Sequence, residues 1–194
     1  MKENASDPYY YNSSKLMMWQ DILTGLFDKN YEGCDHDAHY AKLTEKLREA
    51  TGRNGMFDGM FEFLTLTAHA LAKKSEMGLR LTAAYRSGDR EALVRFAEEE
   101  LPELSRRVSE LRISHMENWM EIYKPFGWDV MDMRYGSLLA RIDSAIRQVK
   151  AYLEGKIERI EELEAERLYY GKEGPCQNNT YGAFVSPSRI DPRA

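Results

Sequence analysis

The sequence predicts an all-α protein, an antiparallel bundle of four to five helices with extended arms at its N- and C-terminal ends. Three observations predict this class: apolar residues recur at steps of three and four, Gly- and Pro-containing turns separate the periodic stretches, and both ends of the chain lose the periodicity. We divide the chain into an arm and junction at residues 1–28, a helical bundle at 29–170 and an extended tail at 171–194. Together they form one structural domain.

The bundle is expected to be organised around one long helix, from Met131 to Leu168. Its charged residues lie on other faces than its apolar stripe, which consists of Leu139, Ile142, Ile146, Val149, Leu153, Ile157, Ile160 and Leu163. Because packing stabilises a helix more than its intrinsic propensity does, the other helices are expected to cover this stripe. Gly155 is its weak point, since glycine costs about 1 kcal/mol relative to alanine.

The chain before the first long helix is expected to be mostly irregular. Residues 1–13 are polar and include Pro8 and three consecutive tyrosines, which indicates an extended arm. Asp21 to Phe27 can form a short helix, and residues 28–35 are expected to form a loop.

Two long helices follow. The first begins at Asp35 or Asp37, because either carboxylate can accept hydrogen bonds from the free N–H groups of a first turn. It ends at Gly52. The second is expected to run without interruption from Met56 to Tyr85.

The third helical stretch, from Arg90 to Tyr123, contains Pro102. Proline inside a helix removes a hydrogen bond and clashes with the preceding turn, so a kink or a break is expected near Glu99 to Leu101. If the chain breaks there, Pro102 becomes a first-turn residue of a new helix, a position that proline tolerates.

The composition excludes several classes of protein. Hydrophobic residues make up 43% and charged residues 30% of the 194 residues, as in ordinary globular domains. The formal net charge of −5 argues against nucleic acid and anionic membranes as partners. No apolar run approaches the roughly 20 residues of a membrane span, and Met1 to Asn4 do not begin a signal peptide. With only two cysteines, which argue against a disulfide framework, we expect a cytoplasmic protein.

No metal or cofactor site is expected. One cluster has the right residue types for a transition metal, namely Cys34, Asp35, His36, Asp37 and His39. We interpret its aspartates as helix caps and its histidines as residues of an exposed first turn. The Glu-x-x-His pattern of di-iron bundles is absent at all four histidines.

No catalytic residues are expected either. The chain has 32 acidic residues, but none forms the adjacent Asp-Glu pair or stands in a context that predicts a pocket. The chain also lacks a phosphate-binding glycine loop and a Gly-x-Ser-x-Gly nucleophile turn. Among the tryptophans, Trp119 is interpreted as a core residue, and the role of Trp19 stays open.

The stretch from Asn12 to Asp28, NSSKLMMWQDILTGLFD, resembles the segment that leaves the catalytic barrel in one bacterial branch of the family 20 β-N-acetylhexosaminidases. In that family a C-terminal helical domain follows, and the tail segment Ser186 to Ile190 is similar to the family's ending. The sequence departs from the family pattern at Gln20, where Asn is frequent, and at Ile22, where Pro is frequent.

The resemblance implies that this chain is a non-catalytic C-terminal accessory domain. Such enzymes hydrolyse terminal N-acetylhexosamine residues, and their catalytic Asp-Glu pair belongs to a barrel that this chain lacks. The resemblance further implies that the helical domain packs on the barrel and supports a homodimer. It places Trp19 and Asp21 close to the substrate.

A second hypothesis is a free-standing α-helical interaction or homodimerisation module that binds through the 139–163 stripe or through the arms. Coverage of that stripe by the chain's own helices distinguishes the two. The accessory-domain hypothesis predicts an exposed apolar patch, with Tyr9 to Tyr11 and Met17 to Trp19 as its expected location. A metal-dependent enzyme at Cys34 to His39 is the third hypothesis.

Overall fold

A computed structural model describes residues 17–168, and every regular element in this range is helical. This confirms the all-α class. The elements, in chain order, are α2 (Asp28–Tyr31), α3 (His36–Ala50), the 3₁₀ turn η1 (Gly55–Phe57), α4 (Asp58–Lys74), α5 (Met77–Ser87), α6 (Arg90–Arg95), the π-helical turn η2 (Phe96–Glu100), α7 (Leu101–Ile122), α8 (Trp128–Leu153) and α9 (Glu161–Glu164).

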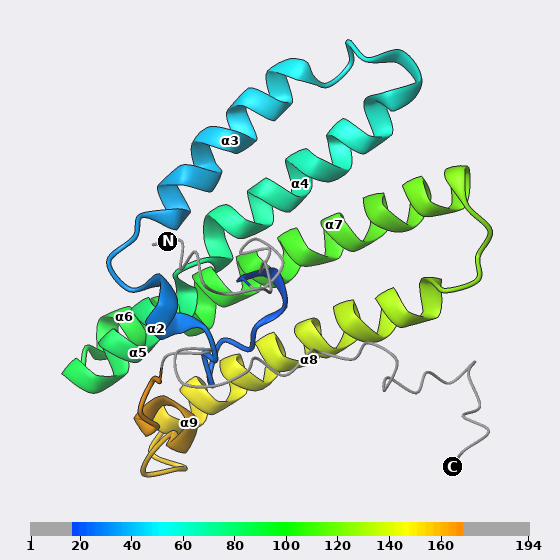
Figure 1. The fold of residues 1–194 in the computed structure, drawn as a ribbon. Helices are drawn as coiled ribbons and strands as arrows, with labels where there is room; N and C mark the ends of the chain where they lie inside the picture. The colour runs from blue at the N-terminus through cyan, green and yellow to red at the C-terminus, as the bar shows by residue number, and fades with distance from the viewer. Residues whose placement is uncertain (1–16, 169–194) are drawn as a thin grey trace.

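The four long helices lie side by side in the order α3, α4, α7, α8, each antiparallel to its neighbour (Figure 1). The predicted antiparallel bundle is therefore confirmed. Its four long helices form an open row, in which each long helix packs against the next. The α3–α4 and α7–α8 turns lie at one end of the row. The short helices α5, α6 and α9 gather at the other end, with the first described residues packed beside them (Figure 1).

The long helix α8 ends earlier than predicted, at Leu153 instead of Leu168. Gly155 adopts a left-handed conformation with φ of 71°. Its N–H donates to the carbonyl of Tyr152, and the N–H of Lys156 donates to that of Ala151, which together form a Schellman motif. The chain then reverses and forms α9, so the apolar residues beyond Gly155 reach the core from a different direction.

The second predicted helix is two helices, because the chain bends at Ser75 and Glu76. The carboxylate of Glu76 accepts a hydrogen bond from the backbone N–H of His36 at 2.7 Å, and the N–H of Glu76 donates to Asp37 at 3.1 Å. The bend thus satisfies one free N–H group at the start of α3 and one at the start of α5. These partners are 39 and 40 residues away, so local periodicity did not reveal the bend.

The disturbance predicted before Pro102 takes the form of a π-helical turn at Phe96–Glu100. The chain does not break there. It widens for one turn, and Pro102 then lies in the first turn of α7, where its missing N–H costs little.

At the start of α3, Asp35 accepts a hydrogen bond from the N–H of Ala38 at 3.2 Å, as predicted for a helix cap. The predicted helix from Asp21 to Phe27 is wrong, since these residues form turns, and α2 lies within the predicted loop 28–35. The predicted arm at residues 1–13, with Tyr9 to Tyr11, and the tail at 171–194 lie outside the described residues. The division of the chain at residues 28 and 170 stays a prediction.

Candidate functional site

The described part of the junction, residues 17–28, is built into the core. Five of its apolar side chains are at most 7% exposed, namely Met17, Met18, Ile22, Leu23 and Phe27. The expectation that Met17 and Met18 form an exposed patch is therefore wrong. Residues 17–19 are helical, and this short stretch lies beside the last residue of α4, because Lys74 donates a hydrogen bond to the carbonyl of Met17.

Lys74, the last residue of α4, holds the start of the junction. Its side chain is 2% exposed, and its Nζ donates to the carbonyls of Met17 at 2.8 Å and Gln20 at 2.7 Å. Burial lowers the pKa of Lys74 to about 8, although the carboxylates of Asp28 and Asp21 favour its charged form. A buried cation thus takes the place of the backbone hydrogen bonds that this segment lacks.

Asp28 is the buried anion of the same region, at 1% exposure. Its Oδ1 accepts from the side-chain amide of Gln20 at 3.1 Å, and its Oδ2 lies 3.5 Å from Nε of Arg167. Burial raises the pKa of Asp28, while Arg167 and Lys74 oppose the rise. Gly25 and Gly78 make room for the carboxylate, because a Cβ atom on either glycine would lie within 3 Å of Oδ2.

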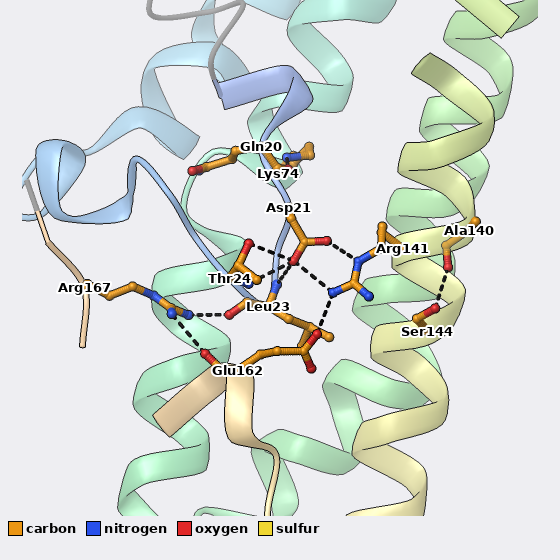
Figure 2. A network of polar contacts seen from close by, with 10 residues as sticks. All are labelled: Gln20, Asp21, Leu23, Thr24, Lys74, Ala140, Arg141, Ser144, Glu162 and Arg167. Carbon is orange, nitrogen blue, oxygen red and sulfur yellow. Dashed lines mark hydrogen bonds and ion pairs between the residues drawn. The ribbon is translucent and has the colours of Figure 1, made fainter. Parts of the chain in front are cut away.

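Asp21 connects the junction to α8 and α9 (Figure 2). Its carboxylate accepts hydrogen bonds from the backbone N–H groups of Leu23 and Thr24, and it forms an ion pair with Arg141, which also binds Glu162 at 2.8 Å. Burial opposes ionisation of Asp21, but the hydrogen bonds from Arg141 and the backbone outweigh it and lower the pKa. The side chain that the sequence predicted as substrate-proximal is thus held by three partners.

Trp19, the other predicted site residue, is partly exposed. Its ring contacts Tyr135 edge-on at a centroid distance of 5.0 Å, and the guanidinium of Arg134 lies 5.6 Å from its centroid. Aromatic rings continue from Tyr135 to Trp128 at 6.5 Å, to Trp119 at 6.0 Å and to Tyr123 at 5.1 Å. This aromatic row joins the junction to the α7–α8 turn. Trp119 packs against the core, as predicted.

Six of the twelve exposed large apolar residues between residues 17 and 168 lie in or beside the α3–α4 and α7–α8 turns, at the end of the row of helices opposite to α5 and α9 (Figure 1). We call Met56, Phe57, Met60, Ile122, Tyr123 and Phe126 the tip surface; their exposure ranges from 46% to 90%. The helix ends next to the two turns are in contact, because Asn118 of α7 donates a hydrogen bond to the carbonyl of Gly59 in α4.

The 139–163 stripe does not supply an exposed surface. Ile142, Val149, Ile160 and Leu163 are at most 1% exposed, and the other four residues are partly buried against the core. The chain's own elements cover it, which argues against this stripe as a partner-binding face.

The two aspartates of the Cys34–His39 cluster cap α3 and bind the start of α5. Asp35 caps the helix, and Asp37 accepts from Glu76 and lies 3.5 Å from Arg80. Among residues 17–168, no group of three or more His, Cys, Asp or Glu side chains is arranged to hold a metal ion.

The sequence matches one family model, the Glycoside Hydrolase 20C C-terminal domain, over residues 1–181. The chain belongs to this family. The match confirms the resemblance seen in the junction and identifies the chain as an accessory domain of a glycoside hydrolase, distinct from the catalytic domain. None of the curated proteins matches the chain. Between residues 17 and 168, no helix combines the length and apolarity needed to cross a bilayer.

Sequence reasoning missed the residues of this family domain that hold the junction: Gln20, Asp28, Lys74, Arg141 and Arg167. One signal was present in the sequence. Lys74 stands three residues after Leu71 and three before Met77, on an apolar stripe where a lysine needs a buried partner. Its partners are more than 50 residues away, so the sequence did not reveal them.

Proposed function

We propose that this chain is the non-catalytic C-terminal accessory domain of a β-N-acetylhexosaminidase of bacterial type, which packs on the catalytic barrel and supports dimerisation of the assembled enzyme. The observation that carries the proposal is the family match over residues 1–181, which includes both the junction and the helices. In this proposal the catalytic Asp-Glu pair belongs to the barrel, and the chain works in the cytoplasm without a cofactor.

The proposed barrel-facing surface runs from Trp19 along the aromatic row to Tyr123. Two observations support it. Met17, the first residue that the structure describes, is held by Lys74 two residues before Trp19, and the proposal places the catalytic domain on this side. Tyr123, at 62% exposure, extends the row to the α7–α8 part of the tip surface, where Ile122 and Phe126 add an exposed apolar area for the barrel to cover.

Within this surface, Trp19 and Asp21 have different proposed roles. Trp19 is the substrate-proximal residue, because its partly exposed aromatic ring can stack on a sugar. Asp21 is proposed to act close to the substrate by holding the junction in place, since its carboxylate is already bound by Arg141 and by two backbone N–H groups.

The proposed contact for dimerisation is the α3–α4 turn. Met56 and Phe57 are 90% and 57% exposed there, and neither belongs to the aromatic row. Light scattering of the assembled enzyme measures this part of the proposal. Replacing both residues with serine is expected to convert a dimer to a monomer, whereas a dimer that persists would contradict it.

The main test is activity toward an aryl N-acetylglucosaminide. The chain is assayed alone and together with a family 20 catalytic domain from the same organism, either mixed or fused. We expect activity that needs the catalytic domain and that rises when the chain is added. Activity of the chain alone would contradict the proposal, and no effect in any combination would favour a free-standing interaction module.

A further inference from the structure

The junction holds one aromatic side chain at the surface while its neighbours are buried. Between residues 17 and 23, Met17, Met18, Gln20, Ile22 and Leu23 are all at most 8% exposed, whereas Trp19 and Asp21 are partly exposed. The Asp21 carboxylate is bound by Arg141, so the Trp19 ring is the side chain that this pattern leaves available for contact, provided that the backbone is fixed on both sides of it.

Lys74 fixes that backbone. Its two hydrogen bonds go to the carbonyls of Met17 and Gln20, which lie on either side of Trp19 in the chain. Burying an ammonium group is costly, and a methionine would fill a similar volume without that cost. It would leave both carbonyls without these donors. The lysine therefore specifies the position of the backbone more than it contributes to packing.

Other contacts of the junction also fix its backbone next to Trp19. The amide of Gln20 binds Asp28 at 3.1 Å and accepts from the N–H of Phe27 at 3.0 Å. Asp21 is bound by Arg141 of α8. The chain after Trp19 is thereby tied to the same helix that carries Tyr135, the ring against which the indole packs.

We propose that Lys74 is a positioning residue, which holds the Trp19 indole against Tyr135 and Arg134 for contact with the substrate. The inference rests on the proposed function, because that function makes Trp19 the substrate-proximal residue. The position of Trp19 is nevertheless measurable without any activity, so the two proposals can fail separately.

The test compares Lys74→Met with Lys73→Met, the same change one residue earlier. Lys73 is a matched control because it pairs with Glu100 at 3.0 Å, away from the junction. The chain has three tryptophans, so ¹⁵N-labelled tryptophan gives three indole N–H signals in NMR, and Trp19→Phe assigns one of them. We expect Lys74→Met to shift the Trp19 signal and Lys73→Met to leave it unchanged. A folded Lys74→Met chain with an unshifted Trp19 signal would overturn the proposal.

The wild-type chain supplies a second readout if Lys74→Met does not fold. The charged groups around the Lys74 amine are Asp21 and Asp28, which attract it, with Arg141 and Arg167 bound to those carboxylates. Loss of the Lys74 proton near pH 8 is expected to move the Trp19 signal more than those of Trp119 and Trp128. A Trp19 signal that stays constant while the Gln20 side-chain amide signal follows the loss of this proton would contradict the proposal.

In the assembled enzyme, Lys74→Met is expected to raise KM by about two- to tenfold with little change in kcat, as when one aromatic contact is lost. Trp19→Ala is expected to do the same. If Lys74→Met shifts the Trp19 signal but neither variant changes KM, the positioning holds and the substrate role of Trp19 fails. If only Trp19→Ala changes KM, the role of Lys74 fails.

Discussion

At the scale of single residues, Lys74 makes the folding of this domain depend on pH. In the unfolded chain a lysine keeps its proton to about pH 10.4, whereas burial lowers the pKa of the folded Lys74 to about 8. Between these values the unfolded state binds more protons than the folded state. Stability must therefore rise with pH in this window.

We expect the free energy of unfolding to increase from pH 8 towards pH 10 by up to about 1.4 kcal/mol per pH unit. Above pH 10 the rise is opposed by Tyr31 and Tyr135, because burial raises the pKa of both hydroxyls and only the unfolded chain ionises them there. Urea unfolding at several pH values measures this. The Lys74→Met chain should lack the rise, and an equal rise in that variant would disprove the assignment to Lys74.

Gly78 is a second residue whose role depends on the junction. A Cβ atom at this position would lie 2.8 Å from Oδ2 of Asp28 and 2.9 Å from the carbonyl of Ile22. Gly78→Ala is expected to lower the free energy of unfolding by about 1–3 kcal/mol, since the Ile22 oxygen is a backbone atom and the Asp28 carboxylate is held by Gln20 and Arg167.

Gly136 supplies the control for this substitution. It lies inside α8, and a Cβ atom there would have no neighbour within 4 Å. Gly136→Ala is expected to stabilise the fold by about 0.5–1 kcal/mol through helix propensity. Urea unfolding curves that show the same change for both alanine variants would contradict the packing argument at Gly78.

At the scale of elements, α8 shows what periodicity can and cannot predict. The stripe from Leu139 to Leu153 was predicted and is helical, because its spacing reflects one face against the core. Beyond Gly155 the spacing of three and four continues in Ile157, Ile160 and Leu163, and these residues are also covered, but in a reversed chain. The spacing of apolar residues therefore predicts which side chains are buried, but it does not predict where the helix ends. Only Gly155 indicated the turn that reverses the chain.

Gly155 can be tested directly. Gly155→Ala places a side chain in the left-handed region, at a cost of about 1–2 kcal/mol. The motif that ends α8 is then weakened, and with it the contact of Ile160 with Tyr85, whose hydroxyl accepts from the Ile160 N–H at 3.0 Å. Thermal unfolding should show a lower midpoint than wild type, whereas an unchanged midpoint would mean that α8 continues through this position.

At the scale of the whole molecule, the junction belongs to the folded core. Burial of an apolar side chain contributes about 1.5–3 kcal/mol as an upper estimate, and five such residues precede α2. Their sum is comparable with the roughly 5–15 kcal/mol by which a domain is stable. A chain that begins at residue 29 is therefore expected to lose cooperative unfolding, seen by circular dichroism. A sharp transition like that of the full chain would show that the junction is dispensable.

The fold class, the antiparallel arrangement of the long helices and the cap at Asp35 were predictable, because each depends on residues close in sequence. The junction network was not, because Lys74, Arg141 and Arg167 find their partners 54 to 144 residues away. The resemblance identified the family from the junction, yet it did not reveal that Met17 and Met18 are core residues.

The most direct test of the account is hydrogen–deuterium exchange of this chain, alone and with a family 20 catalytic domain from the same organism. We predict slower exchange in the peptides that contain Trp19 and residues 119–128, with no change in α3, which lies at the far edge of the row of helices. Protection confined to α3, or no protection anywhere, would contradict the claim that the barrel covers the surface between the junction and the tip.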